Sequence, residues 1–283
     1  MDLVPNLDPH SRTIIEQFIV SRFDDAGARR AVIGLSGGLD SAVVLGLLCS
    51  SLGSDRVDAY HLPCGEGSTA DRKHAEEAAG SCGVKLRTID ISGMVDSAPI
   101  EVSGMARGNL MARVRMVILY AAANTGNGLV VGTSNKSELL MGYFTKYGDG
   151  GADIYPIGDL FKTQVRKLAR QMGIPEGIME KPPSAGLLDG QTDEGEMGMP
   201  YIVLDQVLNG MIMGLSPDRI AEEMDLSSVS DDELRRSGMP LPPGREDIER
   251  VMETVRRSRH KRMSLAIPKV GPATIGVDLR ERW

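Results

Sequence analysis

A glycine-rich segment near the N-terminus carries the residues best suited to chemistry on a phosphate. Gly34–Ser41 (GLSGGLDS) lies between a short apolar run that predicts a strand and a run of Val, Leu and Ala that predicts a helix. At such a junction the backbone amides and the helix dipole form a site for anions. Gly37 and Gly38 let the backbone approach phosphate oxygens, two serines add hydroxyl donors, and Asp40 adds a carboxylate that suits Mg²⁺. The segment therefore predicts a phosphate-binding loop.

Two common phosphate-binding motifs do not describe this loop. A Walker A loop requires a Gly-Lys-Ser/Thr sequence, and the segment contains no lysine; the GxGxxG spacing of dinucleotide-binding loops is also absent. A plain strand-to-helix turn with Asp40 as helix cap is the alternative, which the Ser-Gly-Gly-x-Asp-Ser string disfavours. That string resembles the loop of the ATP pyrophosphatase superfamily, whose members cleave ATP between its α- and β-phosphates.

A second block of sequence narrows the resemblance to one family. Residues Gly132–Ile157, followed by Leu160–Val165, resemble the NAD synthetases, specifically the ammonia-dependent form. Two alternatives are another ATP pyrophosphatase, such as a GMP-synthetase-like or tRNA-thiolating enzyme, and a nucleotide sensor without catalysis. The cysteine spacing disfavours the tRNA enzyme, and the pair Asp40 and Glu138 disfavours the sensor. Supporting pieces of the resemblance are Gly108–Met116, Lys181–Ala185, Gly190–Glu194 and His260–Arg262.

The resemblance implies a ligase that forms a C–N bond in two steps. In that family the carboxylate of deamido-NAD attacks the α-phosphate of ATP, giving an adenylate and pyrophosphate, and ammonia then displaces AMP to give NAD. Because negative charge develops on phosphate, Mg²⁺, backbone amides and lysines are the expected stabilisers. Glutamine-dependent relatives carry an additional amidase domain, which a chain of 283 residues is too short to hold, so free ammonia, or ammonia from a separate partner, is the expected nitrogen donor.

The expected metal and ATP sites lie at the carboxyl edge of the predicted sheet, where open α/β sheets bind ligands. Asp40 and Glu138 follow the first and fourth predicted strands, and two converging carboxylates suit Mg²⁺. The alternative for Glu138 is an exposed helix residue paired with a lysine. No residue is assigned as a general acid or base. The resemblance implies ATP contacts from Gly34, Leu35, Ser36, Gly37, Gly38, Leu39, Asp40, Ser41, Thr133, Lys162 and Ser184, the last of which is Thr in most relatives.

The resemblance places deamido-NAD against a second, mostly basic set of residues. For Arg113 the alternative is a solvated or interface arginine. For the basic segment 256–262 it is a helix end that complements the dipole. Asp193, Glu194 and Glu196 are expected to face solvent, and the aromatic side chains of residues 143–147 are left unassigned. The implied deamido-NAD residues are Arg113, Lys146, Asp153, His260 and Lys261.

Alternating apolar strands and amphipathic helices predict the frame that holds these residues. Such βαβ units form a doubly wound, mostly parallel, Rossmann-like α/β sheet. The predicted strands are 31–35, 57–62, 85–89, 128–133 and 153–157. The predicted helices are 11–22, 41–52, 69–82, 103–124, 134–141, 159–172 with Asp159 as N-cap, 201–213, 217–224 and 246–261.

Composition and length predict one domain over residues 1–283. Within it we expect a lid loop at 181–200 and a basic C-terminal helix at about 246–262. The long helix at 103–124 is apolar around much of its circumference and needs to be covered, and the family resemblance implies that it forms the interface of a homodimer. A net charge of −7 disfavours a nucleic-acid surface, and no apolar run reaches the ~18 residues of a membrane span. Three cysteines at spacings without a metal template, and no visible signal peptide, indicate the cytoplasm.

Overall fold

The computed structural model describes residues 2–65, 69–184, 192–230, 237, 243–263, 268 and 270. At the centre of this part of the chain is a four-stranded parallel sheet in the order β3-β2-β1-β4. In the register of the sheet, Ala31 lies between Val57 and Leu129 of the two neighbouring strands. The strands are β1 (Arg30–Gly34), β2 (Val57–His61), β3 (Leu86–Thr88) and β4 (Gly128–Val131).

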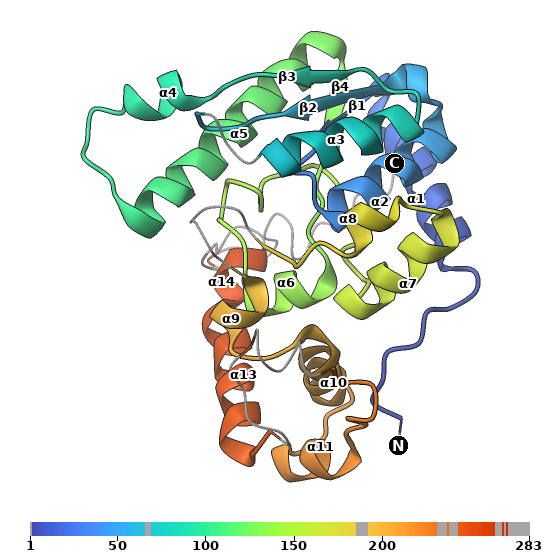
Figure 1. The fold of residues 1–283 in the computed structure, drawn as a ribbon, viewed down its shortest axis with the longest axis vertical. Coiled ribbons are helices and arrows are strands. Elements are labelled where there is room, and N and C mark those ends of the chain that lie inside the picture. The colour runs from blue at the N-terminus through green and yellow to red at the C-terminus, as the bar shows by residue number, and fades with distance from the viewer. Residues whose placement is uncertain are drawn as a thin grey trace.

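Helices cover both faces of the sheet (Figure 1). Successive side chains of a strand point to opposite faces, so Ala31 and Ile33 enter one hydrophobic core while Val32 enters another. The predicted doubly wound α/β architecture is therefore confirmed. The first core is covered by α1 (Ser11–Ala26), α2 (Leu39–Leu52), α3 (Thr69–Ser81) and α7 (Lys162–Met172), and the other by α4 (Ser92–Asp96) and α5 (Gly104–Gly126).

The predicted fifth strand, Asp153–Ile157, is only partly formed. It joins β4 through one parallel bridge between Val131 and Ile154. Gly132 donates its amide N–H to the carbonyl of Ile154 at 2.9 Å. The chain turns at Pro156, which has no N–H with which to continue the pairing. The segment still runs along the sheet edge, which places the residues around it beside β4.

Helix α7 begins later than the sequence predicts. Asp159 was the expected N-cap, but the helix starts at Lys162 and Phe161 occupies the N-cap position. The side chain of Asp159 is 97% exposed and pairs with Lys136 at 3.0 Å. Because a phenylalanine side chain accepts no hydrogen bond, the first amides of α7 need acceptors from elsewhere in the fold.

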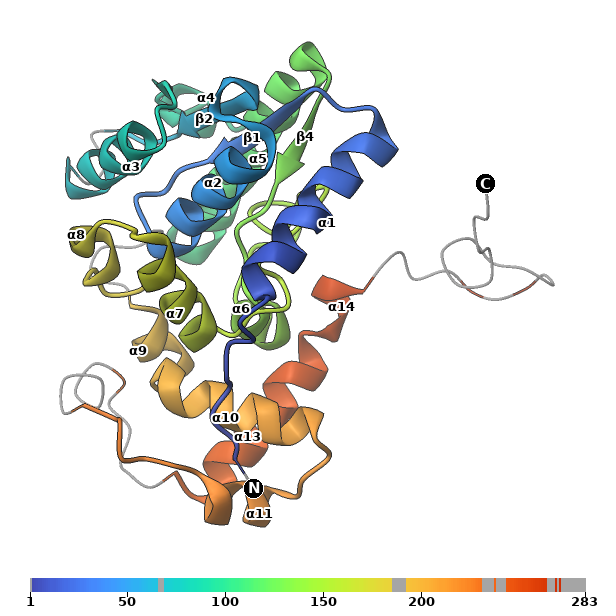
Figure 2. The same cartoon turned by 90° about the vertical axis from the view of Figure 1, so that its right-hand side faces the viewer.

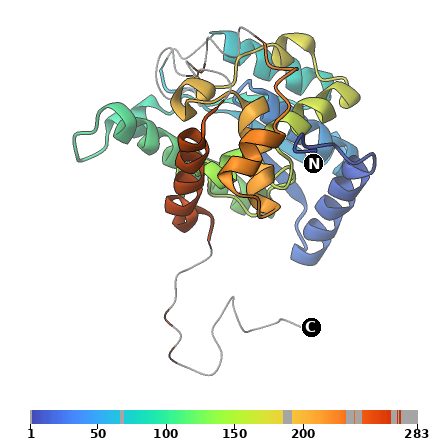
Figure 3. The ribbon, with the colours of Figure 1, turned by 90° about the horizontal axis from the view of Figure 1, so that it is seen from below.

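A second, all-helical layer packs below the sheet layer and has its own hydrophobic core (Figures 1 and 2). Figure 3 shows this layer from below. The N-terminal residues run along it: Leu3 is buried in its core and accepts a hydrogen bond from Asn209 at 3.0 Å. The predicted helix 246–261 is divided at Ser258, whose hydroxyl bonds the carbonyl of Leu140 at 3.0 Å. The layer comprises α6 (Lys136–Met141), α10 (Tyr201–Ile212), α11 (Pro217–Glu223), α13 (Arg245–Arg257) and, beside it, α14 (Arg259–Arg262).

The spacing of apolar residues does not predict several short helices, because a segment of four or five residues is too short to show a helical repeat. One of them, α9 (Asp193–Met197), lies within the predicted lid loop 181–200, of which residues 185–191 fall outside the described part of the chain. Among the described residues no helix is long and apolar enough to span a membrane. The other short elements are α4, α8 (Glu176–Met179) and a 3₁₀ turn at Ser54–Arg56.

Candidate active site

The phosphate loop lies between the end of β1 and the first turn of α2, as predicted. Gly37 has a φ of +76°, and a Cβ there would lie 2.2 Å from the carbonyl oxygen of Asp71, so only glycine fits. The Gly38 amide donates to Ser36 Oγ at 3.2 Å, and Ser41 Oγ donates to the Gly38 carbonyl at 2.9 Å. The loop is thus folded tightly against itself and against the start of α3, at the positive end of the α2 dipole.

Three predicted residues from three separate elements meet beside this loop. Lys162, the first residue of α7, forms ion pairs with Asp40 of α2 and, at 3.5 Å, with Glu138 of α6. Their side chains are 5%, 16% and 15% exposed, respectively. Glu138 is therefore paired with a lysine, as its alternative interpretation supposed, but it is inside the molecule rather than on its surface. The structure brings the two predicted metal ligands and one predicted ATP residue together.

Asn135 completes this cluster and was not predicted. It is fully buried, and its side chain caps α6 by accepting the Glu138 amide N–H at 3.0 Å. Glu138 reciprocates by accepting the Asn135 amide N–H at 3.3 Å. The Asn135 side-chain amide also donates to Asp40 at 3.3 Å. The signal in the sequence was the capping box, an Asn followed three residues later by Glu at the start of a helix.

The electrostatics of the cluster favour a further cation. Burial raises the pKa of Glu138 to about 8, with Asp40 adding to the effect and Lys162 opposing it. Burial alone would lower the pKa of Lys162, but the carboxylates of Asp40 and Glu138 outweigh it and raise that pKa. With two carboxyl groups facing one ammonium, Glu138 holds a proton below about pH 8 when no further cation is bound, and a bound cation would displace that proton. Carboxylate oxygens in such a pair are ligands that Mg²⁺ prefers, together with phosphate and water.

Asp193 contradicts the expectation that the acidic residues after the lid loop face solvent. It is 4% exposed, and Glu194 is fully buried. Asp193 accepts the Tyr201 hydroxyl at 3.2 Å through Oδ2, while its Oδ1 has no hydrogen-bond partner among the described residues. The Tyr201 ring also lies 5.3 Å from the ammonium of Lys162. Helix α9 thus brings a third carboxylate close to the cluster, and the signal for it in the sequence was its place in the matched piece Gly190–Glu194.

The remaining predicted ATP residues lie at the same edge of the sheet. Thr133 is half-buried and follows β4, the neighbour of β1, from which the phosphate loop emerges. Ser184 is exposed at the last described position before the gap. Its segment is anchored near the loop, because Lys181 pairs with Asp71, on whose backbone Gly37 packs.

Four of the five predicted deamido-NAD residues form a connected group. Arg113 Nε on α5 donates to the carbonyl of Lys146 at 3.3 Å, and Lys146 Nζ donates to the carbonyl of His260 at 2.9 Å. Lys261 Nζ donates to the carbonyls of Gly142 and Phe144 at 2.7 and 2.9 Å. Of the predicted pair on α14, the Lys261 side chain is therefore held against the loop 142–148, whereas the His260 side chain is exposed and contributes only its carbonyl.

Asp153 stands apart from that group. Its carboxylate accepts the Tyr120 hydroxyl at 3.0 Å and the Val130 amide N–H at 2.7 Å. These bonds join the segment after the glycine-rich turn to α5 and to β4. In this structure Asp153 therefore organises the sheet edge beside the predicted binding residues.

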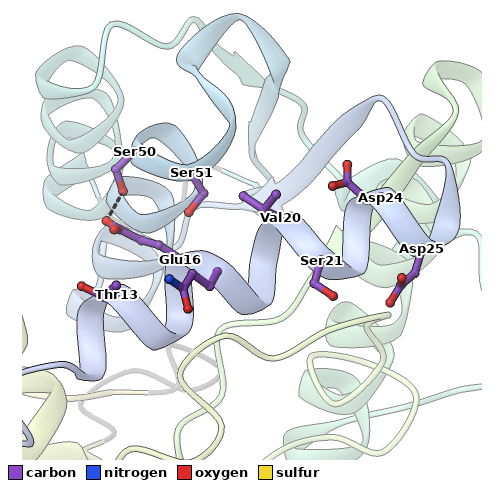
Figure 4. Close-up of a pocket in the computed structure, with 9 residues that line it drawn as sticks. Thr13, Glu16, Val20, Ser21, Asp24, Asp25, Ser50 and Ser51 are labelled. Carbon is purple, nitrogen blue, oxygen red and sulfur yellow. Dashed lines mark hydrogen bonds between the residues drawn. The ribbon is translucent and has the colours of Figure 1, made fainter.

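A groove elsewhere on the molecule is unrelated to these residues. It lies between α1 and the C-terminal end of α2, opposite the phosphate loop (Figure 4). Its lining is acidic and hydroxylic, and Ser50 donates to Glu16 across it at 2.7 Å. The groove brings together no lysine, arginine or histidine to bind a phosphate.

Comparison with known proteins agrees with this geometry. Residues 12–264 match the model of the NAD synthase family. The chain is 38% identical over 279 residues to the NH₃-dependent NAD⁺ synthetase of Methanococcoides burtonii, covering 96% of this chain and 97% of that protein. It is 41% identical over 263 residues to the enzyme of the same name from Methanosarcina acetivorans, covering 90% and 96%.

Solved structures show the same likeness. The structure of NMN synthetase from Francisella tularensis superposes with a TM-score of 0.74 at 32% identity, covering 93% of this chain and all of that one. The NH₃-dependent NAD synthetase from Campylobacter jejuni, solved with a nitrate ion, gives 0.73 at 25% identity, covering 95% and 100%. With the family match extending over most of its length, this chain belongs to the NAD synthase family.

Proposed function

We propose that the cluster of Asp40, Glu138 and Lys162 activates the carboxylate of deamido-NAD with ATP. The chain is an ammonia-dependent NAD synthetase, a ligase that makes NAD. The observation that carries the proposed site is the meeting of these side chains, from three different helices, at the sheet edge where the phosphate loop emerges. Such a site can bind a triphosphate and stabilise the charge that develops on it.

In the first step, ATP lies against the phosphate loop. The loop amides, with Ser36 and Ser41, hold phosphate oxygens, while Thr133 and Ser184 contact the nucleotide. An oxygen of the deamido-NAD carboxylate attacks the α-phosphorus, the bond from that phosphorus to the bridging oxygen breaks, and pyrophosphate leaves. Lys162 stabilises the negative charge of the five-coordinate phosphorus and of the leaving group; its ion pairs keep it protonated through this step.

Asp40 and Glu138 would hold Mg²⁺ in this site. Both carboxyl groups lie beside the Lys162 ammonium, and when both are ionised, as binding of a dication favours, they carry more negative charge than Lys162 neutralises. When bound, Mg²⁺ neutralises charge on the phosphates and orients them.

In the second step, ammonia attacks the carbonyl carbon of the adenylate, the nitrogen loses one proton to water, and AMP leaves with one oxygen of the original carboxylate. Arg113, Lys146, Asp153, His260 and Lys261 hold deamido-NAD during both steps. The connected group of α5, the loop 142–148 and α14 supports this for four of them, and for Asp153 the support is its place at the adjoining sheet edge. No residue of the chain is assigned as a general acid or base.

The chain works as one domain over residues 1–283, since the site draws side chains from both layers. We further propose a cytoplasmic homodimer that pairs through α5, on which Met105 and Val117 are 47% and 51% exposed. Its partners are then small molecules and a second copy of itself, without nucleic acid or membrane.

The test is product analysis with ATP, Mg²⁺, ammonium and either deamido-NAD or nicotinic acid mononucleotide. We expect NAD, AMP and pyrophosphate in equal amounts, with deamido-NAD the better substrate by kcat/KM. The mononucleotide is included because one structural relative is described as an NMN synthetase. A preference for the mononucleotide would overturn the substrate assignment, and formation of ADP and phosphate would overturn the mechanism.

A further inference from the structure

A buried carboxylate in the helical layer has no part in the site described above. Asp205, on α10, is completely buried, and neither the family resemblance nor the expected site includes it. Its Oδ1 accepts the Ser137 hydroxyl at 2.5 Å, and its Oδ2 accepts the Thr163 amide N–H at 2.8 Å. Burial raises the pKa of Asp205 to about 6, while these hydrogen bonds oppose the shift. A buried carboxylate is kept only where such bonds compensate for lost hydration.

Both bonds lead to the first turn of α7. Ser137 Oγ also accepts the Lys162 amide N–H at 3.0 Å, so this hydroxyl links that amide to Asp205. Lys162 and Thr163 are the first two residues of the helix, whose amides have no acceptor within it. Phe161 at the N-cap offers none either. Asp205 therefore caps α7 from another helix, at the end where negative charge also meets the helix dipole favourably.

The same carboxylate fixes two members of the ion cluster relative to each other. Ser137 precedes Glu138 on α6, and Lys162 opens α7, so one side chain on α10 bonds a hydroxyl of α6 and a backbone amide of α7. The ion pairs of Lys162 depend on where the first turn of α7 lies. A shift of that turn would move the ammonium away from Glu138, from which it is separated by 3.5 Å.

We propose that Asp205 is a positioning residue for the adenylation step, acting through Ser137 and the α7 backbone to hold Lys162 at the reacting phosphate. This inference rests on the proposed role of Lys162. It predicts that loss of Asp205 lowers turnover beyond what loss of stability explains, because misplacement of a catalytic group by about 1 Å can cost about 100-fold in rate.

The neighbouring residue provides a matched control. Gln206 is on the same helix and equally buried, and it donates to the Asp225 carbonyl at 2.7 Å and accepts the Asp225 amide N–H at 2.8 Å. It therefore secures the chain after α11 and does not contact α6 or α7 through these bonds. Replacement of Gln206 removes buried hydrogen bonds as replacement of Asp205 does, but leaves the first turn of α7 capped.

The experiment compares Asp205→Asn, Ser137→Ala and Gln206→Met in the full chain, by thermal unfolding and by steady-state turnover. We expect Asp205→Asn and Ser137→Ala to lower kcat by about 10- to 100-fold, with KM for ammonia changed by less than about threefold. Gln206→Met should lower Tm by a similar amount and keep kcat within about twofold. Equal effects of all three on kcat would overturn the inference; Ser137→Ala keeps it testable if Asp205→Asn does not fold.

A second arm combines each variant with Lys162→Met and measures AMP formation at high enzyme concentration. If Asp205 acts through Lys162, adding Asp205→Asn to Lys162→Met lowers the rate by less than about twofold. Multiplying effects would overturn the inference and leave the role of Lys162 intact. Turnover by Lys162→Met alone at the rate of the unmodified chain would instead refute the proposed role of Lys162, and the inference with it.

Discussion

Substitution of Gly37 by alanine tests whether the phosphate loop must keep its present shape. Gly37 has a φ of +76°, and the new Cβ would lie 2.2 Å from the carbonyl oxygen of Asp71 and 2.9 Å from its Cα. The left-handed backbone costs a non-glycine residue about 1–2 kcal/mol. Relief of the overlap with backbone atoms, which cannot rotate away, adds about 1–3 kcal/mol. We therefore expect a loss of about 2–5 kcal/mol in the free energy of unfolding.

Gly65→Ala is the matched control for that substitution. Gly65 has the same φ of +76°, but no atom of the described residues lies within 4 Å of the position its Cβ would take. Its replacement should cost only the backbone component, about 1–2 kcal/mol, and leave nucleotide binding unchanged. Urea unfolding measures the stabilities, and titration calorimetry with Mg·ATP measures the affinity. For Gly37→Ala we expect ATP binding at least about tenfold weaker, which corresponds to about 1.4 kcal/mol. Equal stability and affinity of the two variants would refute the packing of the loop on α3 as its organising contact.

Three further results are expected. Glu138→Gln should lower kcat by about 100-fold or more, whereas Asp159→Asn, at a carboxylate whose side chain is 97% exposed, should leave it within about twofold; steady-state assays at saturating Mg²⁺ decide this. The pKa of Asp205 is raised in the folded state from 3.8 to about 6, so the folded state binds the extra proton and stability falls as pH rises through that window. Unfolding in urea between pH 4 and 7 should show the unmodified chain losing about 3 kcal/mol more than Asp205→Asn, and parallel pH profiles would contradict the burial of a titrating carboxylate. Val117→Glu should convert a dimer into a monomer of about half the mass by light scattering, and an unchanged mass would exclude α5 as the interface.

The sequence was sufficient to predict the four strands of the sheet and the edge at which Asp40, Glu138 and Lys162 meet. Apolar runs identify the parallel strands, and the carboxyl ends of parallel strands lie at one edge, so residues that follow them converge. Asp40 and Glu138 are 98 positions apart in the sequence, yet both contact Lys162. Family resemblance supplied Lys162 itself, since nothing in its local sequence distinguishes it from the other lysines of the chain.

Long-range contacts account for what the sequence could not predict. Asp193 lies in an acidic segment next to a Gly- and Pro-rich stretch, a pattern typical of solvated loops, but the packing of α9 and Tyr201 buries it. The sequence around Asp205 is that of an ordinary helix. The role of Asp205 depends on amides of α7, which lie more than 40 positions earlier in the chain. The local sequence does not indicate that either side chain is buried, because a polar side chain is buried where a hydrogen-bond partner from elsewhere in the fold meets it.

The central claim is that this site joins a carboxylate to the α-phosphorus of ATP before ammonia reacts. Deamido-NAD labelled with ¹⁸O in its carboxylate tests it directly, in a reaction with ATP, Mg²⁺ and ammonium analysed by mass spectrometry. We predict that each AMP released carries one ¹⁸O atom in its phosphate and that pyrophosphate carries none. Unlabelled AMP, or label recovered in inorganic phosphate, would contradict adenylation at this site.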